Sequence, residues 1–298
     1  MKKTSLLKKW ILDKEILVMP GAHDALSAKI IETVGFKAVT LGGYAASAAS
    51  LAKPDVSLLS LTENVNIARN IVQAVDLPVF VDGDTGHGNV TNVQRTVWEF
   101  ESAGVAGHFI EDQVFPKRCG HMEGKKIIPA DEMVAKIKAA VDARRDPDLV
   151  IMARTDAVAT DGLDEAIERA NLYTTAGADL IFVEAPTSRE DMLRCNREIH
   201  APTMAIQIEG GKTPLLTTKE LEELGFNVVV YPNVTVYATA WALKGLWEGL
   251  KKNGSTKHWL DKIIPFNEFN TLIGLDKIRD LESYYYKDLF ECLRQQKR

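Results

Sequence analysis

Cysteine and long apolar runs are scarce in this sequence, and each scarcity excludes a class of protein. The 298 residues include three cysteines, Cys119, Cys195 and Cys292, which form an odd and widely spaced set. Such a set provides no disulfide framework and is typical of a reducing compartment, so we expect a cytoplasmic location. The apolar runs fall well short of the roughly 18–20 residues that a membrane span needs, so no membrane contact is expected.

An excess of positive charge is also missing. The sequence has 36 Lys and Arg against 41 Asp and Glu, a formal net charge of −5. This balance argues against a nucleic-acid or anionic-membrane surface, and we expect no nucleic-acid partner. Residues 1–13 lack the continuous apolar core and the small-residue cleavage site of a signal peptide, so they are expected to form a helix of the mature protein.

One local pattern recurs along the chain: a helix-like segment ends at a glycine, and an apolar run follows at once. The glycines are Gly35, Gly104, Gly177 and Gly225. Glycine adopts the left-handed conformation at low cost, so each is expected to end a helix before a strand. With the other apolar runs, the pattern predicts about eight short strands of a parallel sheet buried on both faces. These strands are residues 16–19, 38–41, 79–81, 108–110, 149–153, 180–183, 203–206 and 228–231.

Amphipathic helical stretches lie between these runs, with no linker between two domains. Alternation of strand and helix through most of the chain predicts a (β/α)8 TIM barrel. The main rival is a doubly wound open sheet, but no G-x-G-x-x-G follows the first strand. We expect residues 1–252 to form the barrel and catalytic domain. Residues 253–298, rich in aromatics, are expected to form a C-terminal helical extension that packs on a neighbouring subunit.

Acidic residues follow consecutive predicted strands. Asp82 and Asp84 follow the third strand, and Glu111 follows the fourth. In a TIM barrel the active site lies at the carboxyl ends of the strands, so these carboxylates are expected to converge and repel one another. A hard divalent cation removes that conflict, and we predict a Mg²⁺ site, with Mn²⁺ possible. The alternative is that these acids cap helices or pair with Arg154.

Arg154 and a glycine pair are the candidate anion-binding groups. The planar guanidinium of Arg154, after the fifth strand, matches a carboxylate with two hydrogen bonds. The backbone of Gly42, Gly43 and Tyr44, after the second strand, can donate further N–H groups, because glycine permits close approach. Together with a metal, these groups describe a site for a 2-oxo or 2-hydroxy acid. The alternative for the glycines is a simple turn.

The stretch Lys117-Arg118-Cys119-Gly120-His121 places a thiol among cations directly after the fourth strand. Neighbouring cations lower the pKa of a cysteine, and a thiol can also act as a proton donor. This stretch therefore predicts catalysis through Cys119. The alternative is a solvated basic loop that carries an incidental cysteine.

Taken together, these motifs resemble the isocitrate lyase / phosphoenolpyruvate mutase superfamily over nearly the full chain. The matching segments are Pro20-Gly21, Lys53-Pro54-Asp55, residues 82–86, 110–113 and 116–121, Gly124-Lys125, residues 153–157, Glu184-Ala185 and residues 209–214. The Lys-Arg-Cys-Gly-His block resembles that of the carbon–carbon lyase branch. The resemblance implies Mg²⁺ dependence, a Cys119 loop that closes over substrate, and a homotetramer made of two helix-swapped dimers.

The resemblance also implies roles for individual residues. The implied catalytic residues are Cys119, His121, Arg154 and Glu184. Substrate binding is implied for Gly42, Gly43, Tyr44, Asp55, Lys117, Arg118, Gly120 and Gln207. Metal binding is implied for Asp82, Asp84 and Glu111.

Lyases of this kind split a 2-hydroxy dicarboxylate by Mg²⁺-dependent retro-aldol cleavage. Two departures bear on the substrate: Thr40 stands where methylisocitrate lyases have a tyrosine, and Ile206 stands where the family has an asparagine that binds the departing carboxylate. An aliphatic group there favours a methyl substituent, so the expected substrate is 2,3-dimethylmalate, giving pyruvate and propionate. The alternatives are 2-methylisocitrate, giving pyruvate and succinate, a carboxyphosphonoenolpyruvate phosphonomutase-type isomerase, and a non-catalytic barrel.

Overall fold

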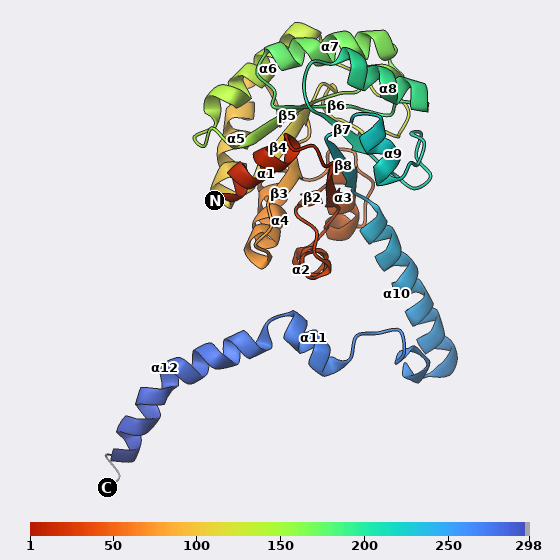
Figure 1. The fold of residues 1–298 in the computed structure, drawn as a ribbon. Helices are drawn as coiled ribbons and strands as arrows, with labels where there is room; N and C mark the ends of the chain where they lie inside the picture. Colours follow the sequence, from red (N-terminus) through yellow and green to blue (C-terminus); the bar gives the residue numbers. More distant parts are fainter. Residues whose placement is uncertain (296–298) are drawn as a thin grey trace. The chain divides into compact units, whose positions relative to one another are not determined.

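The computed structural model describes the backbone of residues 1–295 and the side chains of residues 1–287. Its centre is a sheet of eight parallel strands surrounded by helices (Figure 1). The strands are β1 (Leu17–Pro20), β2 (Val39–Leu41), β3 (Val79–Asp82), β4 (Gly107–Glu111), β5 (Val150–Thr155), β6 (Leu180–Val183), β7 (Thr203–Ile206) and β8 (Val228–Tyr231). All eight predicted strands are confirmed.

The strands pair in the order β1-β8-β7-β6-β5-β4-β3-β2. Leu17 of β1 pairs with Val228 of β8, so the first strand lies beside the last. An isolated parallel bridge between Gly21 and Thr40 links the ends of β1 and β2. The nearly closed cylinder that results confirms the predicted (β/α)8 TIM barrel.

The helices after the strands cover the outside of the barrel, and one helix before the first strand packs with its interior cluster (Figure 1). They are α1 (Lys3–Ile11), α2 (Ala25–Val34), α3 (Gly43–Leu51), α4 (Leu61–Ala74), α5 (Val90–Ala103), α6 (Ala130–Ala143), α7 (Leu163–Thr175), α8 (Arg189–Glu198) and α9 (Thr218–Glu223), with a short 3₁₀ helix at Ala157–Ala159. Helix α3 begins at Gly43, so the alternative of a simple turn at these glycines is wrong.

The four predicted helix-ending glycines all have positive φ. The values are 98° at Gly35, 85° at Gly104, 107° at Gly177 and 97° at Gly225. A side chain at such an angle would be strained, so glycine lets each helix end and the chain turn directly into the next strand.

Alternate strand residues face two separate cores. Met19, Phe80, Phe109 and Phe182 belong to the cluster inside the barrel. Residues between them on the same strands, such as Val81 and Ile110, pack with the surrounding helices. Burial on both faces explains why the strands are apolar throughout, and it leaves the strand ends as the place for polar side chains.

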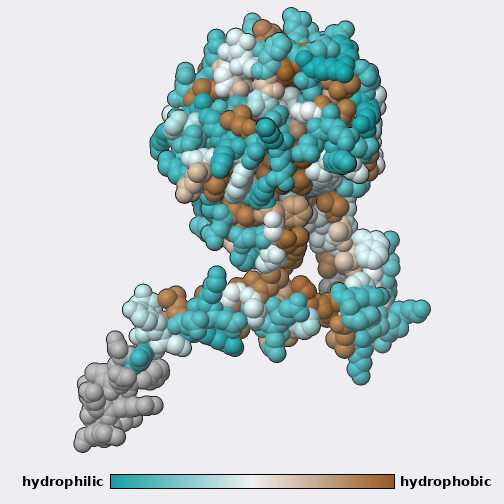
Figure 2. Space-filling model, viewed as in Figure 1, coloured by the Kyte–Doolittle hydropathy of each residue, from teal (hydrophilic) through white to brown (hydrophobic). Residues whose placement is uncertain are grey.

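The chain divides into two compact units, Met1–Ala238 and Thr239–Arg298, within helix α10 (Val234–Asn253). The predicted boundary at 252/253 lies at the end of this helix. The second unit continues with a 3₁₀ helix at Lys257–Trp259, α11 (Phe266–Leu272) and α12 (Leu275–Gln295). Many of its apolar side chains are exposed, as the brown atoms in Figure 2 show. Among the described residues, no helix is long and apolar enough to cross a membrane.

Candidate active site

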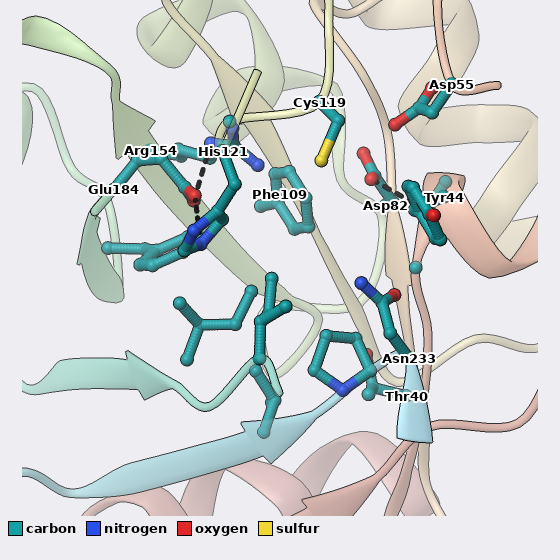
Figure 3. Close-up of a pocket in the computed structure, with 18 of the residues that line it drawn as sticks. Thr40, Tyr44, Asp55, Asp82, Phe109, Cys119, His121, Arg154, Glu184 and Asn233 are labelled. Carbon is teal, nitrogen blue, oxygen red and sulfur yellow. Dashed lines mark hydrogen bonds and ion pairs between the residues drawn. The ribbon is translucent and has the colours of Figure 1, made fainter. Parts of the chain in front are cut away.

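A pocket opens at the carboxyl ends of the barrel strands (Figure 3). Its polar lining comes from β2, β3 and β5, from the start of α3, and from the segments that follow α3, β4, β6 and β8. The polar and glycine residues that line it are Thr40, Gly42, Gly43, Tyr44, Asp55, Asp82, Cys119, Gly120, His121, Arg154, Glu184 and Asn233. Ten of the predicted site residues are in this set.

The acids predicted to bind metal surround a buried lysine. The Lys117 ammonium donates to Asp55 at 2.7 Å, and it lies 2.8 Å from Oδ1 of Asp84 and 4.0 Å from Oδ2 of Asp82. Burial raises the pKa of Asp84 and raises that of Glu111 well above its ordinary value. Burial also disfavours the charged lysine, but the surrounding carboxylates raise the pKa of Lys117 well above its ordinary value. Lys117 therefore stays charged and partly neutralises the acids.

The donor chemistry of this cluster fits a hard divalent cation. Oε1 of Glu111 is buried without a hydrogen-bond partner, whereas its Oε2 faces Arg154 and Oδ1 of Asp84 faces Lys117 as ion pairs. Among the described residues, no three acidic, His or Cys side chains are already arranged to hold a metal ion together. Mg²⁺ commonly takes only one or two carboxylates directly and reaches others through water, so a complete cage is not required.

Arg154 is held among three carboxylates. Its guanidinium donates to Asp156 at 2.9 and 3.1 Å, and it lies 3.3 Å from Glu111 and 3.4 Å from Glu184. It also lies over the rings of Phe109 and Phe182. These contacts fix the direction of the guanidinium. Of the three acids predicted to bind metal, Glu111 does form an ion pair with Arg154, as the alternative interpretation expected.

His121 connects this group to the loop after β7. Its Nδ1 accepts from the backbone N–H of Lys212 at 2.9 Å. In the neutral ring the proton is then on Nε2, which faces Glu184 at 3.1 Å. Although burial opposes ionisation of Glu184, Arg154 and His121 lower the pKa of its carboxyl group. Glu184 is therefore an anion that orients His121.

The Cys119 loop is folded over the pocket by several anchors. Lys125, on the same loop, donates to the carbonyl of Gly120 at 2.5 Å and to Asp156 at 2.7 Å. A Cβ at Gly120 would lie 2.3 Å from both Arg154 and Glu184, so only glycine fits there. Further anchors are the bonds from Gln113 to the carbonyl of Arg118 and from the Cys119 N–H to Asp55.

The Cys119 thiol points into the pocket, above the open space (Figure 3). The expectation that its neighbours lower its pKa is wrong. Burial raises the pKa of Cys119 to about 11. The two cations beside it in sequence turn elsewhere: Lys117 binds Asp55, and Arg118 reaches the carbonyl of Glu123 at the surface. The thiol thus keeps its proton at neutral pH.

Three predicted substrate-binding residues do not line the pocket: Lys117, which binds Asp55, and Gln207 and Arg118. Gln207 is buried, and its amide binds the carbonyls of Ile206 and Pro214 and the N–H of Leu216. Arg118 is exposed on the outer side of the loop. The Gly43 N–H lines the pocket but already donates to Asp82 at 2.9 Å.

One polar residue and most of the apolar wall could not be identified from the sequence motifs. Asn233, after β8, is buried and faces the pocket (Figure 3). The apolar lining is Phe80, Phe109, Phe182, Met204, Ile206, Ile208, Val230 and Pro232. The position of Asn233 just after β8, at the carboxyl end of a barrel strand, was the available signal.

Comparison with known proteins identifies the family of the chain. The phosphoenolpyruvate phosphomutase family matches residues 7–250. A 2,3-dimethylmalate lyase of Eubacterium barkeri is 50% identical over 96% of this chain and 99% of its own. A chloroplastic carboxyvinyl-carboxyphosphonate phosphorylmutase of Arabidopsis thaliana is 46% identical over 92% of this chain and 82% of its own.

Solved structures of the same superfamily share this fold. A crystal structure of 2,3-dimethylmalate lyase, described as a PEP mutase/isocitrate lyase superfamily member, superposes with a TM-score of 0.90. Its sequence is 31% identical, and the match covers 96% of each chain. The resemblance inferred from the motifs is confirmed, and the chain belongs to the phosphoenolpyruvate phosphomutase family of the PEP mutase/isocitrate lyase superfamily.

Proposed function

We propose that this protein is a carbon–carbon lyase that cleaves 2,3-dimethylmalate to pyruvate and propionate. The observation that carries the proposal is the Cys119 thiol, which faces a pocket lined in part by Ile206, Val230 and Pro232. An aliphatic wall accepts the methyl group on C3 and disfavours a second charged group there. The 50% identity to a protein named 2,3-dimethylmalate lyase supports the same substrate.

The proposed cleavage uses groups on opposite sides of the pocket. The C2 hydroxyl loses its proton, the C2–C3 bond breaks, and its electron pair moves into the departing carboxylate to form an enediolate. The Cys119 thiol then gives its proton to C3, which completes propionate, and the proton from the hydroxyl balances the one that the thiol loses. A thiol that stays protonated at neutral pH is suited to this step as general acid.

Arg154 and its neighbours keep the reacting oxygens in place. Because Arg154 is locked by Asp156 and Glu184, its charge is oriented before substrate binds, which favours the developing anion without reorganisation. His121 and the folded loop close the pocket, and exclusion of water protects the enediolate from premature protonation.

The proposed cofactor is Mg²⁺, with Mn²⁺ as the alternative, held by Asp82, Asp84 and Glu111. When bound, the cation supplies positive charge that stabilises the oxygens of the 2-oxo acid. The buried Oε1 of Glu111, which has no hydrogen-bond partner, and the clustering of the other carboxylates around Lys117 support this assignment.

The test is an assay of pyruvate release from 2,3-dimethylmalate and from 2-methylisocitrate in the presence of Mg²⁺. We expect a higher kcat/KM for 2,3-dimethylmalate and no turnover after chelation of the metal. A clear preference for 2-methylisocitrate would make the protein a methylisocitrate lyase.

A phosphonomutase-type isomerase is tested separately, because a relative bears a phosphorylmutase name. Cys119→Ser should remove most lyase turnover, by about 100-fold or more, the usual contribution of a general acid. Cys195→Ala is the matched control, because Cys195 is a buried thiol on α8 outside the pocket. Rearrangement of a phosphonate substrate, unaffected by Cys119→Ser, would favour the isomerase.

We further propose that the protein is cytoplasmic and assembles as a homotetramer of two helix-swapped dimers, with residues 253–298 packed on a neighbouring subunit. The exposed apolar side chains of these residues support a partner surface. They include Leu260, Phe266, Ile273, Ile278, Leu281 and Tyr284.

A further inference from the structure

Asn233 directly precedes helix α10, at its N-cap position, but its side chain does not cap the helix. Its backbone carbonyl accepts from the N–H of Tyr237 at 3.1 Å, which is the first bond of the helix. An asparagine at this position commonly accepts a backbone N–H with its side chain. Here Oδ1 has no hydrogen-bond partner, and Nδ2 only approaches the Tyr237 hydroxyl at 3.5 Å.

The side chain instead faces the pocket. Asn233 is only 2% exposed and lines the pocket with its amide nitrogen directed toward the open space below Cys119 (Figure 3). A buried amide whose oxygen neither caps the helix nor accepts any other hydrogen bond lowers the stability of the fold. Such a cost is expected where the group has a ligand to bind.

Few other donors in the pocket are free to bind a second carboxylate. The Arg154 charge is shared among Glu111, Asp156 and Glu184. His121 binds Lys212 with one nitrogen and faces Glu184 with the other. On the wall formed by the ends of β7 and β8, the neighbours of Asn233 are aliphatic, and they include Ile206, Val230 and Pro232.

We propose that Asn233 determines specificity by binding the carboxylate of the departing acid through its Nδ2–H. This inference rests on the proposed lyase function and adds the residue that recognises the second half of the substrate. A neutral amide on an aliphatic wall suits a departing acid with one carboxylate and an alkyl group, such as propionate. A second carboxylate on that acid would meet the aliphatic wall without a donor.

The experiment measures inhibition of pyruvate release by each half of the substrate. Propionate represents the departing acid, and oxalate with Mg²⁺ represents the oxo-acid half. We expect Asn233→Ala to weaken inhibition by propionate about 10- to 100-fold, the effect of losing a hydrogen bond to a charged group. Inhibition by oxalate should stay within about twofold of wild type, since the proposed contact is absent from that half.

Asn89→Ala is the matched control. Asn89 begins helix α5, and its side chain does cap the helix by accepting from Thr91. This variant should lower the unfolding temperature and leave propionate inhibition unchanged. Asn233→Ala should weaken propionate inhibition without lowering the unfolding temperature.

The outcomes separate this inference from the proposed function. Normal cleavage with unchanged propionate inhibition in Asn233→Ala would overturn the inference and leave the lyase intact. Equal weakening of oxalate and propionate would also overturn it, because Asn233 would then belong to the oxo-acid half. Absence of cleavage of any 2-hydroxy diacid by wild type would overturn the lyase function first.

Discussion

The ionisation state of Cys119 is set by burial rather than by its neighbours in sequence. With a pKa of about 11, the thiol loses its proton only as the pH rises toward 11. Because alkylating reagents attack the thiolate, the reaction of Cys119 with iodoacetamide should be slow at pH 7–8 and should rise up to about pH 11.

Mass spectrometry of the peptide that carries Cys119 measures this rate. The peptide with Cys195 is an internal reference, because that thiol is 2% exposed and should react little until the protein unfolds. Full alkylation of Cys119 at pH 7 at the rate of a free thiolate would contradict the proposed proton donor.

Lys117 neutralises the acids when no cation is bound. Lys117→Met should therefore destabilise the metal-free protein by roughly 3–5 kcal/mol, the cost of removing one partner of a buried ion pair. Added Mg²⁺ should recover part of this loss, because the cation relieves the repulsion among the same carboxylates. Thermal unfolding in EDTA and in Mg²⁺ measures both effects.

Arg118→Met is the matched control for this prediction. Arg118 is the next residue along the chain but is exposed, and its stability effect should be small. Equal unfolding temperatures for the two variants in EDTA would mean that Lys117 does not support the acids.

At the residue scale, the sequence identified the chemistry but not the directions of side chains. Asp82, Cys119 and Arg154 could be predicted because they sit at or just after strand ends, where a TIM barrel places its site. For Gln207 and Asn233, the sequence did not predict which side chain faces the pocket. Both lie near strand ends, yet loop backbone contacts hold Gln207 while Asn233 turns inward.

At the scale of elements, the Cys119 loop is held in place at both of its ends. Lys117 holds one end to Asp55, and Lys125 holds the other to Asp156, which in turn orients Arg154. Sequence motifs identified this loop, but the contact of Lys125 depends on the folded chain and could not be predicted.

Lys125→Met should loosen the loop and misplace Arg154 together. We expect faster amide hydrogen exchange across residues 117–126 and a 10- to 100-fold fall in kcat, the usual effect of losing a supporting contact. Lys126→Met is the control, since Lys126 is exposed and its backbone alone binds Val114. Unchanged exchange with lowered kcat would show that Lys125 acts without holding the loop.

The strands and several barrel helices could be predicted because four glycines mark the ends of α2, α5, α7 and α9. Helix α3 was not predicted, since nine residues of mainly Gly, Ala and Ser carry no clear apolar period. Its start at Gly43 matters for the site, because the N–H there binds Asp82.

At the scale of the whole molecule, the two units differ in how much of their apolar surface is buried. The first has its own buried core, whereas no residue described in α10 or α11 is buried. Phe266 is 81% exposed within the single chain. Large apolar side chains in such number mark an interaction surface, which is the reason to expect association through residues 253–298.

Introducing charge into this surface should therefore change the assembly but not the barrel. Phe266→Asp combined with Ile273→Asp should convert the proposed tetramer into smaller species, measured as molar mass by light scattering during size-exclusion chromatography. Leu12→Asp is the control, because Leu12 is also exposed but lies just after α1 on the first unit. A wild-type monomer at micromolar concentration, or an unchanged mass in the double variant, would contradict association through this extension, because charge placed in an apolar interface is strongly unfavourable.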